Sequence, residues 1–148
     1  EDEIRRVAFT TVEKGNAPEK GPRTLQDVEN EMDEVRLDSR TLDRLIYRAN
    51  IDNEIEFQGQ KLAIVEAIEL ATQLRAKSRF HKELASAEKE ELQYGFSEST
   101  TVYRVALFEP EDYRLKALQT EKDAHKLSNL INAKNYSITL AFDDSKYF

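Results

Sequence analysis

The chain has 148 residues, of which 39% are hydrophobic and 34% are charged, and its formal net charge is −7. This length is sufficient for one domain with its own hydrophobic core. The acidic balance argues against nucleic acid and against a membrane of anionic lipid as partners, because both are negatively charged. The absence of cysteine excludes a disulfide framework and cysteine-ligated metal, and it fits a reducing compartment, so we expect a cytoplasmic protein.

The first predicted elements are a strand, a loop and a helix start. Residues 4–12 are rich in β-branched and aromatic types, which predicts a strand. Residues 14–23 contain two glycines and two prolines, which is typical of a loop. Thr24, with Asp27 three residues later, is a form of the capping box that begins a helix.

A long helix is predicted over residues 24–49. Its apolar residues recur at alternating spacings of three and four, the pattern of a heptad seam. A helix with such a seam needs partner helices. The residues of this seam are Leu25, Val28, Met32, Val35, Ser39, Leu42, Ile46 and Ala49.

Residues 50–61 are interpreted as the tip of a helical hairpin. Asn50 tolerates left-handed backbone and is predicted to end the helix. Ile55 and Phe57 alternate with polar residues, which predicts a short β-element, and Gly59 predicts a turn. We favour an apolar pair that holds the tip to the helices, and a ligand or partner site is the alternative.

The second half of the chain repeats these patterns. A helix is predicted over 62–90, with a wide apolar face in its first half. Residues 100–108 predict a second strand, and Pro110 begins a helix over 110–132. Residues 136–142 alternate strictly and predict a third strand. The seam of the last helix comprises Tyr113, Ala117, Thr120, Ala124, Leu127 and Ile131.

The expected fold class is α+β, mainly α, in a single domain of residues 1–148. We expect helices 24–49 and 62–90 to form a long antiparallel hairpin, with helix 110–132 as a third helix. The three strands are expected to form a small antiparallel sheet at one end.

Three segments resemble the septicolysin-like family of bacterial coiled-coil proteins. They are the run of residues 48–50 with the turn at Gly59 and the helix start at 62–67, the segment 131–140, and the segment 97–103. Ala49 and Tyr136 depart from the family, which has Thr and Trp there. The resemblance implies the fold and a further helix before residue 1, and it carries no activity for this uncharacterised family.

Few residues suggest chemistry. Glu121 and His125 are four apart and share a helix face, but their spacing differs from that of a di-iron bundle, so we expect no metal and no cofactor. Arg48 at the end of the first arm could orient the tip. Asp52 and its neighbours fail the spacing of a calcium loop. The candidate tip or interaction residues are therefore Arg48, Asn50, Asp52 and Gly59.

The sequence favours a non-catalytic scaffold or interaction module that forms a homo-oligomer through its helical faces. The first alternative is a membrane-active, cytolysin-like protein, against which the negative charge argues. The second alternative is a metal- or carboxylate-dependent enzyme, which would need Glu121 and His125 to converge with other acids. The sequence identifies no catalytic residue and no small-molecule ligand.

Overall fold

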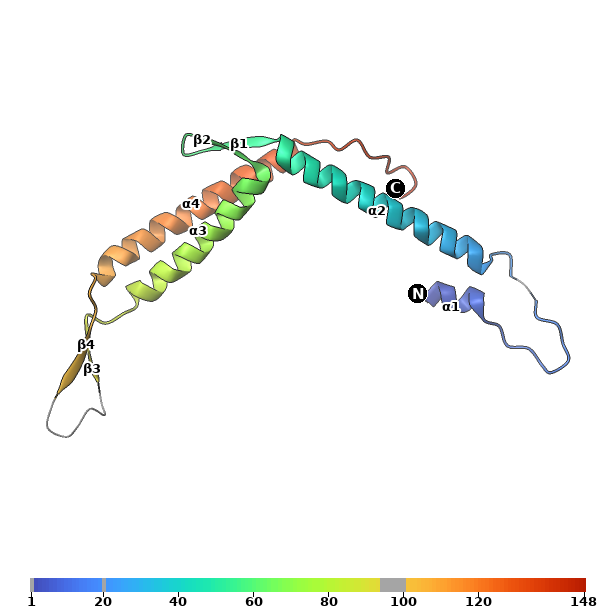
Figure 1. Cartoon of the computed structure of the whole chain (residues 1–148), viewed down its shortest axis with the longest axis horizontal. Coiled ribbons are helices and arrows are strands. Elements are labelled where there is room, and N and C mark those ends of the chain that lie inside the picture. Colours follow the sequence, from blue (N-terminus) through green and yellow to red (C-terminus); the bar gives the residue numbers. More distant parts are fainter. Residues whose placement is uncertain (1, 20, 94–100) are drawn as a thin grey trace. The chain divides into compact units, whose positions relative to one another are not determined.

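The computed structural model describes residues 2–19, 21–93 and 101–148. As predicted, the fold is mainly α with small antiparallel sheets (Figure 1). In chain order the elements are α1 (Asp2–Ala8), α2 (Leu25–Asp52), β1 (Glu54–Phe57), β2 (Gln60–Ala63), α3 (Ile64–Ala85), β3 (Glu90–Gln93), β4 (Val102–Val105) and α4 (Pro110–Tyr136).

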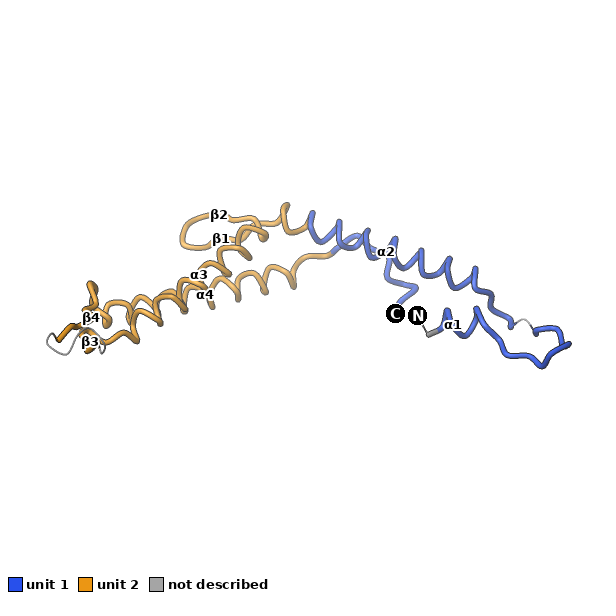
Figure 2. Tube along the Cα trace, turned by 60° about the horizontal axis from the view of Figure 1, so that its bottom comes forward, with its two compact units in different colours: residues 1–48, 140–148 blue, residues 49–139 orange. Residues whose placement is uncertain are grey.

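The described residues form two compact units (Figure 2). The first contains residues 1–48 and 140–148, and the second contains residues 49–139. Most of α2 therefore belongs to the first unit, whereas α3 and α4 both belong to the second. Residues 1–148 were expected to form a single domain, and the described residues divide into two compact units.

The antiparallel helical hairpin of the structure is α3 with α4, which lie side by side (Figures 1 and 2). Cross-helix bonds fix their opposite directions, because Arg75 bonds Ser128 while Lys82 bonds Glu121. The hairpin partner of α3 is therefore α4, whereas helix 24–49 was expected in that place. The seam of α4 is buried and packs against α3. The β3–β4 hairpin connects these two helices.

The core of the second unit lies between α3 and α4 next to β1. Ile64 and Leu127 have no exposed surface, and Ile55 and Phe57 of β1 belong to the same cluster. The prediction that this apolar pair holds the β-element to the helices is confirmed. The other members of the cluster are Ala67, Ala71 and Ile131.

The end of α2 lies later than predicted. Asn50 is inside the helix, so its expected role as the helix stop is wrong. Asn53 closes α2 instead, since its backbone N–H and its side-chain Nδ2 both donate to the Ala49 carbonyl, at 3.1 and 3.0 Å. The Asn53 carbonyl then accepts from the N–H of Ile64 at 3.0 Å, which joins the ends of α2 and α3 across the β-hairpin.

The predicted β-element and glycine turn are confirmed. β1 and β2 are antiparallel, with Phe57 opposite Gln60. The two residues of the turn, Gln58 and Gly59, both have positive φ, of 50° and 78°. This is the geometry of a two-residue type I′ turn, in which glycine avoids the steric cost of left-handed backbone.

The first predicted strand, 4–12, is wrong, because its beginning forms α1. Ile4, Val7 and Ala8 are half-buried, with the i, i+3, i+4 spacing of a helix face. The β-branched composition that predicted a strand therefore did not decide the conformation. Helical bonding satisfies the backbone locally, whereas a strand needs a neighbour.

The third predicted strand, 136–142, is also wrong. Tyr136 ends α4, and the N–H groups of Ser137 and Ile138 bond carbonyls of the last helical turn. Ile138 packs against the core of the second unit without pairing to a strand. The alternation thus describes an extended segment with apolar contacts on one side.

The remaining strand forms a separate hairpin, so the single sheet expected at one end is replaced by two sheets of two strands. β4 lies within the predicted strand 100–108, of which residue 100 is outside the described residues. Its partner β3 occupies Glu90–Gln93, where the end of helix 62–90 was expected. That helix ends earlier, at Ala85, and begins at Ile64, because residues 60–63 belong to β2.

Candidate functional site

The four candidate tip residues do not form a compact site. Arg48 and Asp52 are exposed, one turn apart near the end of α2, and both side chains are engaged in interactions. Asn50 is half-buried between them in sequence. Gly59 lies at the far end of β1, and a strand of this length extends about 10 Å. The geometry explains Gly59 as a turn residue and assigns no chemistry to the set.

The predicted pair Glu121 and His125 does lie on one face of α4. Glu121 is engaged by α3, since Lys82 Nζ donates to its Oε1 at 2.7 Å. This bond and the charge of Lys82 lower the pKa of Glu121, and the charge of His125 acts in the same direction. The carboxylate is therefore held ionised by a cation rather than poised to take a proton.

Glu121 and His125 line a groove between α3 and α4, which we name the α3–α4 groove. Its volume is about 470 Å³. The floor is made by the small residues Ser78 and Ala124, both buried, and longer side chains form the walls. The residues that line the groove are Arg75, Ser78, Arg79 and Lys82 from α3, and Glu121, Ala124, His125 and Ser128 from α4.

Cross-helix bonds fix the two ends of this groove. At one end Arg75 Nη2 donates to Ser128 Oγ at 2.7 Å, and Ser128 Oγ donates to the Ala124 carbonyl at 2.8 Å. At the other end Lys82 bonds Glu121. Between them Arg79 has no hydrogen bond or ion pair within the part of the chain that the structure describes. The groove thus has ordered ends and an uncommitted cation near its middle.

A buried polar contact lies below the groove, in the seam itself. His81 is 8% exposed, and its Nδ1 lies 3.3 Å from Thr120 Oγ1. Thr120 Oγ1 donates its proton to the Lys116 carbonyl at 2.7 Å, so His81 must donate to Thr120, which assigns the proton to Nδ1. The edge of Tyr113 closes the other side, with ring centroids 5.6 Å apart. A polar pair of this kind helps to specify the register of two helices.

Sequence reasoning missed both the groove and the polar pair. Large apolar residues become sparse in α3 after Arg75, yet Ser78 and His81 continue the seam of Ile64, Ala67 and Ala71 at the same spacing. A second signal was available. Residues 70–82 contain four Lys or Arg and no acidic residue, within a chain whose net charge is −7.

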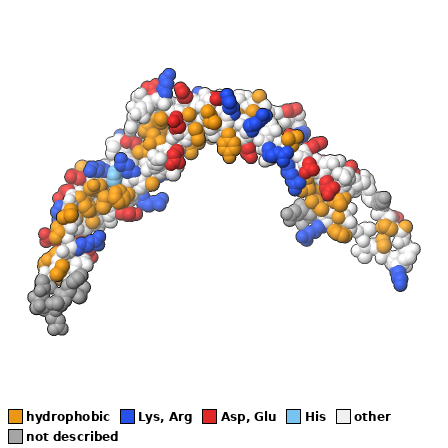
Figure 3. Space-filling model, viewed as in Figure 1, with side chains coloured by type: hydrophobic (Ala, Val, Ile, Leu, Met, Phe, Trp, Pro, Cys, Tyr) orange, Lys and Arg blue, Asp and Glu red, His pale blue; other side chains and the backbone are white. Residues whose placement is uncertain are grey.

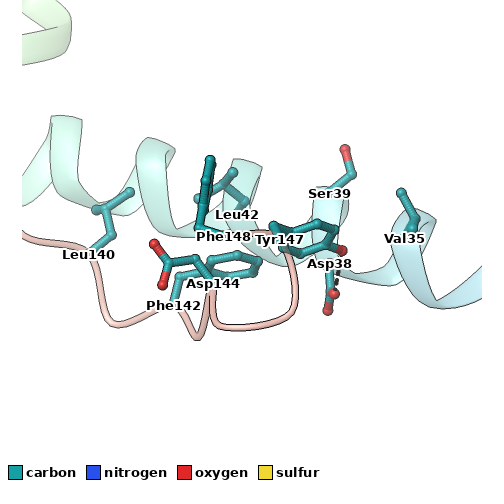
Figure 4. A pocket seen from close by; sticks show the side chains of 9 residues that line it. All are labelled: Val35, Asp38, Ser39, Leu42, Leu140, Phe142, Asp144, Tyr147 and Phe148. Carbon is teal, nitrogen blue, oxygen red and sulfur yellow. Dashed lines mark hydrogen bonds between the residues drawn. The ribbon is translucent and has the colours of Figure 1, made fainter.

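The first unit contains a second groove, between α2 and the C-terminal segment (Figure 4). Its volume is about 480 Å³. Tyr147 donates its hydroxyl proton to Asp38 at 2.8 Å, and Lys146 forms an ion pair with the same carboxylate. These bonds, with Lys146 the larger cause, lower the pKa of Asp38. Its other lining residues are Val35, Ser39, Leu42, Leu140, Phe142, Asp144 and Phe148.

The seam of α2, which we call the α2 seam, is partly exposed. Val28 is the only buried residue of this helix. Val35 is 53% exposed and Ile46 is 40% exposed, although both occupy seam positions. Figure 3 shows hydrophobic side chains at the surface of both units, among charged ones.

The structure brings together no candidate metal site in the residues it describes. Among them, no group of three or more His, Asp or Glu side chains is placed to hold an ion. The residues that a metal-dependent enzyme would require therefore do not converge around Glu121. None of the described helices combines the length and apolar character needed to cross a membrane.

The chain matches no protein-family model, no curated protein and no solved structure.

Proposed function

We propose that the protein is a cytoplasmic, non-catalytic helical scaffold that assembles with copies of itself through the α2 seam. One observation carries the proposal. The α2 seam has heptad spacing along the helix, yet Val28 is its only buried member. Since an isolated helix with such a seam is stabilised mainly by packing, a second helix is the natural occupant.

A second copy of α2 fits this seam in an antiparallel register. Seam residues of two antiparallel helices face each other in layers. Alignment of Ser39 with Leu42 of a second copy also aligns Val35 with Ile46 of that copy. The two most exposed apolar residues of the seam would then cover each other, twice by symmetry. The C-terminal segment beside Ser39 and Leu42 would share this surface with the partner helix.

The charges beside the seam favour the antiparallel orientation. In a parallel pair, flanking positions five residues apart meet, which sets Asp38 against Asp43 and Glu31 against Arg36. Repulsion in one pair therefore opposes attraction in the other. In the antiparallel register above, Arg36 meets Asp43 near the centre of the interface and Asp38 meets Leu45, whereas the like charges Glu31 and Asp52 meet only near the helix ends.

The resemblance to the septicolysin-like family belongs to this proposal. It adds the expectation of a bacterial coiled-coil protein and contributes no reaction. The exposed α2 seam supports the proposal independently of that resemblance.

Disulfide trapping tests both the assembly and its orientation, because the natural chain has no cysteine. Val35→Cys and Ile46→Cys proteins, mixed under mild oxidation, should form a covalent heterodimer, since the two β-carbons would lie within disulfide range. Val35→Cys alone should remain uncrosslinked. A mixture of Val35→Cys with Tyr47→Cys is the control, because Tyr47 is exposed and lies outside the seam.

Each outcome of this experiment has a meaning. Efficient crosslinking of Val35→Cys with itself would replace the antiparallel register by a parallel one. Absence of any covalent dimer at tens of micromolar protein would contradict assembly through the α2 seam.

A further inference from the structure

The α3–α4 groove combines positive charge with a defined volume. Arg75, Arg79 and Lys82 contribute three cations and Glu121 contributes one carboxylate, which leaves two net positive charges while His125 is neutral. The whole chain has a net charge of −7. A cationic concavity on an acidic protein attracts anions to that place specifically.

We propose that the α3–α4 groove binds a small molecule carrying two linked phosphate groups, of the pyrophosphate class. Its volume of about 470 Å³ lies in the usual range of small-ligand sites. The charged side chains of the lining favour a charged ligand over an apolar one. Two guanidinium groups on one wall supply the planar forks that pair with phosphate oxygens.

The spacing of the cations selects two phosphates rather than one. Arg75 and Lys82 are seven residues apart on α3, about 10 Å along the helix axis, with Arg79 between them. One phosphate can reach only neighbouring members of this row. Two linked phosphates are longer, so together they can contact Arg79 and the cations at both ends of the row.

The existing bonds prepare the site for such a ligand. Ser128 holds the Arg75 guanidinium at one end, and Glu121 holds Lys82 at the other. Arg79 and His125 are exposed and make no hydrogen bond or ion pair within the described part of the chain, so they can engage a ligand without breaking an internal contact. Fixed cations beside the uncommitted Arg79 reduce the ordering cost of binding.

Calorimetric titration of the full chain with pyrophosphate at low ionic strength tests the proposal. We expect a 1:1 complex per chain, with inorganic phosphate bound at least tenfold more weakly. Arg79→Ala should weaken pyrophosphate binding at least tenfold. Lys126→Ala is the matched control, because Lys126 is an exposed cation of α4 outside the lining, and it should change binding less than twofold.

Two results would overturn this assignment. One is the absence of saturable binding at millimolar pyrophosphate. The other is an equal loss of affinity in Arg79→Ala and Lys126→Ala, which would mean that the ligand senses only overall charge. Ile46→Lys places a charge in the α2 seam and should weaken self-assembly. This variant should bind pyrophosphate as the natural chain does, so the binding test is independent of self-assembly.

Discussion

The α3–α4 hairpin and α2 carry the same kind of seam, which is buried in the hairpin and partly exposed in α2. In α4 the predicted seam is buried, with Leu127 fully enclosed by α3 and β1. In α2 the seam has equally regular spacing, but Val35 and Ile46 remain open to solvent. Heptad spacing therefore identifies the face of a helix that needs a partner. Which helix becomes the partner depends on the connections between the helices.

The contrast assigns different roles to the two units. The second unit has its own core, in which helices and a β-hairpin enclose each other. The first unit has a long helix with one buried residue and a C-terminal segment beside it. We expect substitutions to affect folding in the second unit and association in the first.

The largest effect should come from Leu127→Ala. Removing this fully buried side chain leaves a cavity between α3 and α4, and we expect a loss of about 2–5 kcal/mol in the free energy of unfolding. Val35→Ala, at an exposed position of the α2 seam, should change the same quantity by less than about 0.5 kcal/mol in dilute protein. Urea denaturation of both variants measures the difference, and similar losses would remove the distinction between the two seams.

Next in size is the effect of Ile46→Lys on association. A charge at the centre of a self-complementary apolar interface should weaken assembly at least tenfold, or about 1.4 kcal/mol. Sedimentation equilibrium measures the shift toward the 17.1 kDa monomer. Tyr47→Lys, one residue along and 69% exposed, should leave the mass unchanged. Identical behaviour of the two variants would exclude the α2 seam as the interface.

A smaller loss is expected from Gly59→Ala in the β1–β2 turn. A Cβ at this position would meet no atom within 4 Å, so the cost is that of positive φ alone, about 1 kcal/mol. Gly21→Ala in the first unit is the comparison, because its φ is ordinary and its nearest atom is 4.0 Å away. Thermal unfolding should show a lower midpoint for Gly59→Ala only, and equal midpoints would contradict the turn geometry.

The smallest effect concerns the C-terminal segment and pH. The bonds from Lys146 and Tyr147 lower the pKa of Asp38, so they favour the docked segment above the ordinary carboxyl value of 3.8. This contribution should be lost as the pH falls through the lowered pKa. NMR titration of the Tyr147 amide should therefore show a transition below pH 3.8 that is absent in Asp38→Asn. The same transition in both proteins would mean that another carboxyl group controls the segment.

Much of the secondary structure could be predicted from sequence, since local signals determine it. Pro110 begins α4, and Thr24 and Asp27 bond each other reciprocally at the start of α2. The turn at Gly59 was likewise predicted. The strands expected at 4–12 and 136–142 were wrong because a strand depends on a neighbour that local composition does not supply.

The site was harder to predict than the elements. Glu121 and His125 were correctly predicted to share one face of α4. The cations that surround them come from α3, and α3 had been expected to pair with a different helix. Cross-helix bonds such as Arg75 to Ser128 follow only from the correct pairing. A search for acid-free basic segments would have found residues 70–82 without the fold.

The central claim is that assembly covers the α2 seam, whereas α3 and α4 cover each other within one chain. Amide hydrogen exchange at several protein concentrations tests this claim most directly. Peptides from residues 25–48 should become more protected as concentration rises, because assembly covers the α2 seam. Peptides from α3 and α4 should keep the same protection throughout, because each already covers the other. Protection of residues 25–48 that does not change with concentration would contradict the account.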